Sequence, residues 1–408
     1  MKKLAWLGCL TLVLSAFLLI SFGCTRTTDE AAKGPIRFGG SLPLTGRLAV
    51  EGKEMHQGYQ LWAKHVNARG GLLGRPVELL IYDDRSDAQT SADLYQQLIL
   101  RDKVDLVLGP DTSPLAIVVS TITEKLRYPM IPYANADEIW RRGYKYVFEI
   151  LPPAMHELDG ALAFAKQQRL MRIALINENT VWARTVARGV IENAPAIGLE
   201  LVSHEEYAKG TTDFRRLLRR VNDVKADVLL TAAYVEESIQ IVRDLKRLRF
   251  APKLYASAYA ASLDGFGATL GQDAEYVLAM SEWEPEHNLP LPGIRTFIED
   301  FRKEYERSPS SPAAGAYGIA QVLEAAVKRA GSLDRDKIRD ALAVLDLVTV
   351  YGRYKVDPEG IAIGHEILLI QWQKGKKQIV WPEAYATAKL IFPIPPWNAR
   401  NARSHTKP

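Results

Sequence analysis

The chain has 408 residues, of which 47% are hydrophobic and 25% charged, a composition typical of globular proteins that bury large cores. Its length predicts two or three domains. The formal net charge is +4, from 52 basic and 48 acidic residues, and no basic block stands out. Binding to nucleic acid, which needs a concentrated basic surface, is therefore not expected.

The first residues predict export. A Met-Lys-Lys start precedes an apolar run over residues 4–23, the pattern of a secretory signal. The run is also long enough to span a bilayer, so an uncleaved anchor is one alternative. The sequence SFGC, which ends at Cys24, is similar to a bacterial lipobox, although Leu is usual where Ser21 stands. We expect Cys24 to be lipidated and to become the mature N-terminus, with ordinary cleavage as the second alternative.

A short tether is expected after the signal. Residues 24–34 are mostly small and polar, which suits a flexible link between a lipid anchor and a folded body. The other cysteine, Cys9, lies within the signal, so we expect no disulfide in the exported chain.

Strands and helices alternate from residue 36 onward. Short apolar runs without clean alternation predict strands buried on both faces. They are Ile36–Leu42, Val77–Tyr82, Val104–Leu108, Arg172–Asn177, Leu199–His204, Ala226–Thr231 and Lys253–Ser257. Apolar faces with helical spacing lie between them, at Met55-Tyr59-Trp62-Val66, Phe214-Leu217-Leu218-Val221 and Ile241-Val242-Leu245-Leu248. The alternation predicts an α/β fold with parallel sheets covered on both sides.

Two breaks in this alternation predict crossings between lobes. They are the sequences YKYVFEILPP, residues 144–153, and MSEWEPE, residues 280–286. We therefore expect a first lobe made of residues 35–150 and 285–355, and a second made of residues 151–284 and 356–400.

The last third of the chain changes character. Long helices are predicted at Ile294–Glu306 and Ala313–Ala330, and residues 351–381 are predicted to be rich in strand. The tail FPIPPW, residues 392–397, is expected to lie extended on the surface because its prolines exclude a helix and a central strand.

Polar residues follow the predicted strands at their carboxyl ends, where open parallel sheets bind ligands. The pair Ser113-Pro114 predicts a helix start, with Ser113 as N-cap and Pro114 at the first helical position. Its unpaired N–H groups could hold a ligand carboxylate. The alternative is that Ser113 only caps its own helix. After the next strand, Asn135 or Asp137 is expected to cap the following helix.

Three aromatic residues follow strands in the second half of the chain. Trp182, Tyr234 and Tyr259 would suit a wall of mixed apolar and polar character around a ligand. The alternative for each is packing between lobes.

Sequence motifs typical of catalytic and cofactor-binding sites are missing from this chain. It contains no G-x-S-x-G, H-E-x-x-H, P-loop or C-x-x-C motif, so we expect neither catalysis nor a cofactor. The acids Asp83, Asp84 and Asp87 are expected to cap the next helix and face solvent rather than bind a metal, because no histidine lies nearby. His156, beside Glu157, is expected on the surface.

Six segments together carry a resemblance to a known family. They are GSLPLTG (40–46), VNARGGLLGRPVELLIYDDRSD (66–87), GPDTS (109–113), PMIPYANAD (129–137), RGYKYVFEI (142–150) and the final PPW. In order and spacing the chain resembles, from about residue 36 to 397, the periplasmic substrate-binding proteins for branched-chain amino acids, which serve ABC-type importers. The resemblance implies a type I periplasmic binding fold: two Rossmann-like α/β lobes with parallel sheets, joined by three crossovers and closing on a solute without altering it.

The resemblance also implies a ligand site. Ser113 matches the serine that holds the ligand's carboxylate. Ala134, Asn135 and Ala136 lie in the segment that supplies backbone and hydroxyl groups to the same carboxylate. Tyr234 matches a ligand-facing tyrosine.

Several positions depart from the family's pattern. Trp182 replaces a tyrosine, Ala136 replaces a threonine, and Glu51 stands where an aromatic residue is usual. Ala258 takes the place of the acid that pairs with the ligand's ammonium. The family's frequent cysteine pair falls on Ser86 and Thr112, in keeping with a chain free of disulfides.

These departures bear on the ligand. A zwitterion needs an anionic partner for its ammonium, because an unpaired buried charge is costly. With Ala258 in the acid's place, Glu51 or Asp111 supplies that charge, or the ligand has no ammonium. The expected ligand is therefore an amino acid, an aromatic or aliphatic carboxylate, or an amide.

The sequence as a whole predicts an exported lipoprotein, periplasmic or at the cell surface and held to the membrane by its anchor. It would bind a small solute between two lobes and deliver it to an ABC permease. One alternative is a sensor that presents its closed form to a signalling partner. The other is an envelope hydrolase, for which turnover of a bound compound would be the evidence.

Overall fold

A computed structural model describes residues 34–285 and 291–400. Its strands are β1 (Ile36–Leu42), β2 (Val77–Asp83), β3 (Leu106–Val107), β4 (Arg172–Glu178), β5 (Glu200–Tyr207), β6 (Val228–Ala232), β7 (Leu254–Ser257), β8 (Leu278–Ser281), β9 (Leu347–Val348), β10 (Arg353–Tyr354), β11 (Leu368–Gln373) and β12 (Lys376–Trp381). Its α-helices are α1 (Ala49–Ala68), α2 (Ala88–Leu100), α3 (Ser113–Lys125), α4 (Asp159–Gln167), α5 (Val181–Ala196), α6 (Arg215–Asp223), α7 (Val235–Arg247), α8 (Asp264–Leu270), α9 (Ile294–Tyr305), α10 (Ser311–Ala330), α11 (Arg335–Val344) and α12 (Trp397–Arg400).

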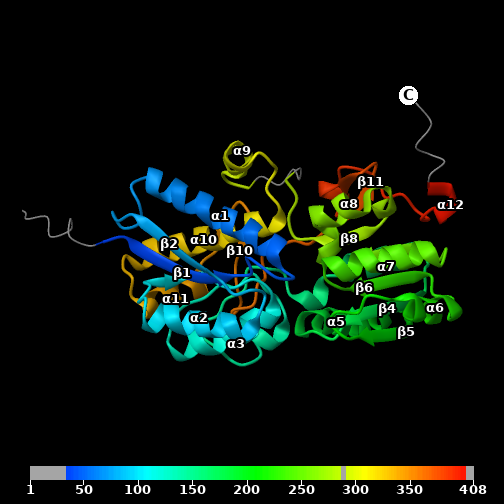
Figure 1. The fold of residues 1–408 in the computed structure, drawn as a ribbon, viewed down its shortest axis with the longest axis horizontal. Helices are drawn as coiled ribbons and strands as arrows, with labels where there is room; N and C mark the ends of the chain where they lie inside the picture. Colours follow the sequence, from blue (N-terminus) through cyan, green and yellow to red (C-terminus); the bar gives the residue numbers. More distant parts are fainter. Residues whose placement is uncertain (1–33, 286–290, 401–408) are drawn as a thin grey trace, which may run out of the picture. The chain divides into compact units, whose positions relative to one another are not determined.

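The strands form two principal sheets, each covered by helices (Figure 1). The first has the order β2-β1-β3 and is parallel. The second has the order β12-β11-β8-β7-β6-β4-β5, parallel from β8 to β5 and antiparallel at β11 and β12. We call the first sheet with its helices the first lobe, and the second sheet with its helices the second lobe. The predicted α/β class with two sheet-centred lobes is confirmed, while the residue boundaries of the lobes stay a prediction.

Helix α1 shows why the first lobe forms where the sequence predicts it. Met55, Tyr59, Trp62 and Val66 are buried on one face, as their spacing indicates. The helix packs closely on α10, because a Cβ on Gly58 would lie 2.1 Å from the carbonyl oxygen of Ala313. Only glycine permits that approach.

The predicted strands and helices of the second lobe are present, and the strand ends differ from the predicted ones by at most three residues. The apolar faces predicted near α6 and α7 are buried at Phe214, Leu218, Ile241 and Leu245 among others. In the first lobe β3 is shorter than predicted. The amide of Val104 bonds the carbonyl of Leu98 in the turn after α2, so that residue does not pair in the sheet.

Two local predictions are wrong. Asp87 caps α2 through Thr90, but Asp84 is fully buried and accepts a hydrogen bond from Ser41 Oγ at 2.8 Å instead of facing solvent. The tail 392–397 is not wholly extended on the surface, because Ile394 is buried in the core and α12 begins at Trp397. The prediction that residues 351–381 are rich in strand is confirmed, because β10, β11 and β12 all lie within this region.

Membrane and metal sites are not found in the described part of the chain. Within residues 34–285 and 291–400, no helix combines the length and the apolar character that a membrane span requires. Over the same residues, no cluster of His, Cys, Asp or Glu is arranged to hold a metal ion. The apolar run 4–23 and Cys24 lie outside the described residues.

Candidate functional site

A small cavity lies where the carboxyl ends of strands from both sheets meet, as expected for open parallel sheets. Its wall in the first lobe comes from the segments after β3 and around residue 133, and its wall in the second lobe from the ends of β4, β6, β7 and β8. The lining residues are Asp111, Thr112, Ser113, Tyr133, Ala134, Asn135, Leu151, Trp182, Tyr234, Tyr259 and Glu282. Most of the residues singled out in the sequence therefore come together here.

The cavity is narrow, with a volume of about 20 Å³. Pockets for small organic ligands typically measure roughly 300–1,000 Å³. A solute of the size of leucine therefore needs the two lobes to move apart before it enters.

The Ser113 side chain binds the neighbouring segment of the cavity wall and does not cap α3. The N-cap is Thr112, which has no capping hydrogen bond, and Ser113 is the first helical residue. Its hydroxyl oxygen instead accepts the backbone N–H of Ala136 at 3.1 Å and, more weakly, that of Asn135 at 3.4 Å. The prediction that Ser113 is the N-cap is wrong because Thr112 takes that place, with a φ of +61° that non-glycine residues rarely adopt.

Asn135 lines the cavity but caps no helix, contrary to prediction. Its amide Nδ2 donates to the carbonyl of Pro152 at 2.9 Å and to Glu157 Oε1 at 2.8 Å. The following 3₁₀ turn, Asp137–Ile139, begins after Ala136 without a side-chain cap, so the same prediction for Asp137 is also wrong. Asn135 thus ties the first lobe's wall to a buried acid.

That acid, Glu157, was missed in the sequence. Its Oε1 also accepts the indole N–H of Trp182 at 2.8 Å. Burial raises the pKa of Glu157 to about 8, with the charge of Glu282 adding to the effect. His156 beside it is exposed, as predicted. A buried acid next to an exposed histidine gives no distinguishing signal in a single sequence.

The three predicted aromatic residues pack together against the cavity. The ring of Trp182 lies 5.1 Å from that of Tyr234 and 5.3 Å from that of Tyr259, measured between centroids. All three line the cavity. They form a second-lobe wall of large apolar area with polar edges.

Three other predicted residues do not line the cavity. Glu51 is buried at the start of α1, Ala136 is buried behind Ser113, and Ala258 is buried with its amide bonded to the carbonyl of Thr231. Glu51 still acts on the cavity, because its charge contributes to raising the pKa of Asp111. Burial raises the pKa of Glu51 itself to about 7.

Two acids reach the cavity directly. Burial raises the pKa of Asp111 well above its usual value, and the charges of Glu51 and Asp84 add to the effect. Burial likewise raises the pKa of Glu282. Glu282 Oε2 accepts the hydroxyls of Tyr133 at 2.6 Å and Tyr351 at 2.8 Å, whereas Asp111 Oδ2 is buried without a hydrogen-bond partner.

Arg47 joins the lobes beside the cavity. It follows β1 in the first lobe, and its Nη2 lies 2.6 Å from Glu237 Oε2 and 3.1 Å from Glu178 Oε1, both in the second lobe. The guanidinium also stacks over Tyr234, 4.6 Å from the ring centroid. We call Arg47, Glu178 and Glu237 the interlobe triad. The sequence offered no signal for it, because its members are 131 and 190 residues apart.

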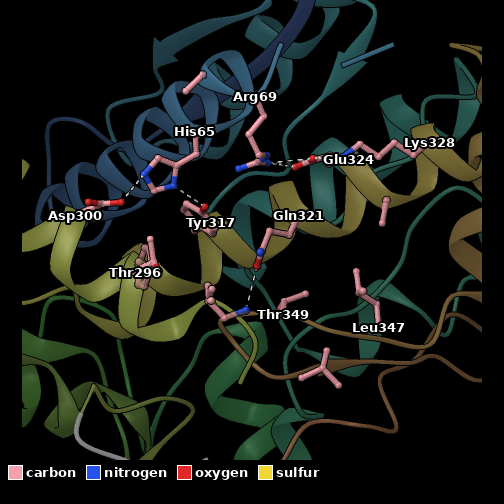
Figure 2. A pocket seen from close by; sticks show the side chains of 16 residues that line it. His65, Arg69, Thr296, Asp300, Tyr317, Gln321, Glu324, Lys328, Leu347 and Thr349 are labelled. Carbon is pink, nitrogen blue, oxygen red and sulfur yellow. Dashed lines mark hydrogen bonds and ion pairs between the residues drawn. The ribbon is translucent and has the colours of Figure 1, made fainter. Parts of the chain in front are cut away.

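A larger hollow lies beside α1 and α10, away from these strand ends, with a volume of about 550 Å³. Figure 2 shows that its charged side chains face one another. His65 pairs with Asp300 at 3.1 Å, and Glu324 accepts from both Arg69 and Lys328. Because these charges are satisfied within the wall, the smaller cavity is the better candidate despite its size.

Comparison with known proteins agrees with this geometry. Residues 35–377 match the model of a family described as periplasmic binding protein. The chain belongs to this family. Family and fold are those of substrate-binding proteins rather than enzymes, and membership implies an exported or periplasmic location.

The chain is similar to curated proteins named Leu/Ile/Val-binding protein homologues. It is 25% identical to Leu/Ile/Val-binding protein homolog 7 of Brucella suis, over 89% of this chain and 95% of the relative. It is 26% identical to homolog 8 of the same organism, over 93% of this chain and 98% of the relative. The resemblance stated from the sequence is confirmed.

Solved structures show the shared fold. A leucine-binding protein from Thermotoga maritima superposes with a TM-score of 0.77 at 21% identity, covering 84% of this chain and 97% of that one. A solute-binding protein of an ABC transporter from R. palustris, in complex with benzoate, has a TM-score of 0.77 at 19% identity, covering 88% of this chain and 99% of that one. Proteins of this fold thus bind ligands as different as amino acids and benzoates, and the type I periplasmic binding fold is confirmed.

Proposed function

We propose that this chain is the extracytoplasmic receptor of an ABC importer, which captures a small solute between its lobes and delivers it to a permease without altering it. The observation that carries the proposal is the cavity at the meeting of strand ends from both sheets. Its wall combines polar groups from the first lobe with three aromatic rings from the second. A site divided between two lobes favours a clamp that opens and closes.

The proposal accounts for the small volume of the cavity. A closed clamp with a volume of about 20 Å³ admits no solute, so binding requires an open form. The interlobe triad and the bond from Asn135 to Glu157 stabilise the closed form. A ligand that contacts both walls shifts the population toward closure, and a permease can read the closed shape.

A thermal-shift screen across amino acids, amines, aromatic acids and amides tests the capture of a solute. A ligand present at 100 times its Kd should stabilise the folded protein by about 2.7 kcal/mol. Small-angle scattering at saturation should then show a smaller radius of gyration than without ligand. Unchanged scattering with a confirmed ligand would count against the clamp, and conversion of that ligand to a product would favour an enzyme instead.

The membrane anchor is the second part of the proposal. Cys24 lies outside the described residues, and the support for its lipidation is the small residue before it and the polar stretch after it. Cys24→Ser should release the protein from the membrane fraction or leave its signal unprocessed. Ser21→Leu, which restores the usual lipobox residue, is the matched control and should stay in the membrane fraction. A Cys24→Ser protein that fractionates and migrates like the parent would refute lipidation.

A further inference from the structure

The cavity between the lobes is unbalanced in charge. Asp111 and Glu282 line it, and Glu157 lies directly behind Asn135 and Trp182. No lysine, arginine or histidine is among the described residues that line it. The cation beside it, Arg47, already contacts two second-lobe carboxylates. The described lining of the cavity therefore contains acidic side chains and no basic side chain to pair with them.

The acids differ in what they contact. Glu282 accepts hydroxyl hydrogens from Tyr133, Tyr351 and Ser311, and Glu157 accepts from two N–H groups. Asp111 Oδ2 and Glu157 Oε2 are both buried without a hydrogen bond. Of these two acids only Asp111, which is 2% exposed, lines the cavity. A buried carboxylate without a partner is costly unless it holds a proton or meets a cation.

Backbone N–H groups that could hold a ligand carboxylate are already engaged in the same cavity. The Ser113 hydroxyl oxygen accepts the backbone N–H groups of Ala136 and Asn135, so these N–H groups are directed at a serine and not at open space. A free ligand carboxylate would also lie near Asp111 and Glu282, and either acid in its ionised form would repel it. A lone acid such as an aliphatic or aromatic carboxylate is therefore disfavoured.

We propose that the solute bound in this cavity carries a protonated nitrogen, that Asp111 is the residue that pairs with it, and that the solute has no free carboxylate. This inference rests on the proposed function. The ligand class is a small organic ammonium or amidinium with an apolar body. The body packs on Trp182, Tyr234 and Tyr259, and the rings attract the cation as well. Of the two acids considered from the sequence, Asp111 is chosen because Glu51 does not line the cavity.

Calorimetry with compounds that share one carbon skeleton tests the charge. Leucinamide is a cation, leucine a zwitterion, 4-methylpentanamide neutral and 4-methylpentanoate an anion. Benzylamine, benzamide and benzoate form a second, aromatic set. At pH 7 the cation of at least one set should bind tighter than its anion by tenfold or more, because a hydrogen bond to a charged group is gained only by the cation.

Asp111→Asn identifies the partner. It should weaken binding of the cation by tenfold or more, and it should change the affinity for the neutral amide of the same skeleton by less than about threefold. The melting temperature should stay at or above that of the parent, because a buried acid is replaced by an amide of the same shape. Asp213→Asn, at the exposed start of α6, is the control and should keep parent affinity.

The outcomes separate the inference from the proposed function. Tight binding of an anion or a neutral amide, with its cation bound no better, would overturn the inference and leave the receptor intact. Equal affinity of the cation for the parent and for a folded Asp111→Asn protein would also overturn it. Failure of every cation in both sets, together with failure of the wider screen, would overturn both.

Discussion

The interlobe triad should set how far the two lobes separate in the absence of ligand. Arg47→Ala removes the guanidinium and leaves Glu178 and Glu237 facing each other, with side chains 0% and 4% exposed. Two buried carboxylates without a counter-ion disfavour the closed form strongly, and opening restores their contact with water. The substitution should therefore shift the protein toward the open form rather than unfold either lobe.

The size of the effect follows from the burial of the triad. Removing one partner of a buried, hydrogen-bonded charge pair costs about 2–5 kcal/mol. We take the lower part of that range, about 2–3 kcal/mol, because the Arg47 side chain is 19% exposed. A ligand that binds only the closed form then loses at most roughly 30–150-fold in apparent affinity, because that factor is the largest by which the closed fraction can fall.

Small-angle scattering of the ligand-free protein measures the shift. Arg47→Ala should have a larger radius of gyration than the parent. Arg184→Ala, which removes a pair with Glu206 that lies within the second lobe, should not. Adding Glu178→Gln and Glu237→Gln to Arg47→Ala should restore compaction, because the repulsion is gone. Equal radii for the parent and Arg47→Ala would refute the idea that the triad holds the lobes together.

Two further outcomes concern single buried groups. Ser113→Ala leaves the Ala136 N–H without its partner at 3.1 Å, so the free energy of unfolding should fall by about 1–3 kcal/mol. The control Thr121→Ala, at an exposed position on the same helix, should change it by less than about 0.5 kcal/mol. Equal melting temperatures of the parent and both variants would contradict this role of Ser113. Burial raises the pKa of Glu157 to about 8 in the folded protein, against 4.5 in the unfolded chain. Between these two pH values the folded state binds more protons than the unfolded state, so the free energy of unfolding should fall as the pH rises. Urea unfolding at pH 5.5 and 7.5 should show this loss, at most about 1.4 kcal/mol per pH unit from this group, and Glu157→Gln should reduce it; an identical loss in both proteins would show that Glu157 is not protonated when folded.

The sequence predicts the fold well because its strands and helices are strongly patterned. The buried face of α1 and the buried runs of β1 and β4 follow directly from the spacing of apolar residues. The aromatic wall was also predictable, since Trp182, Tyr234 and Tyr259 each follow a strand whose carboxyl end must face the same edge.

What the sequence could not predict depends on contacts between distant segments. Ser113 was assigned as an N-cap from its position before Pro114, but the strained Thr112 takes that place and leaves the Ser113 hydroxyl to bind Ala136. Glu157, Glu282 and Arg47 acquire their roles only when the lobes come together. Local pattern predicts which residues a helix or strand buries, and it carries no information on which charges meet across 131 residues or more.

Glu282 has a consequence for the order in which a solute is captured. It lies just after β8, where the chain leaves the second sheet, yet its carboxylate is bonded to Tyr133 and Tyr351, which belong to the core around α1 and α10. When the lobes part, Glu282 therefore stays with Asp111, and the aromatic rings move away from both. A solute then meets the acids first and the rings afterwards. Arrival should be accelerated by charge and slowed by added salt, whereas the lifetime of the complex should depend on the rings that close over it.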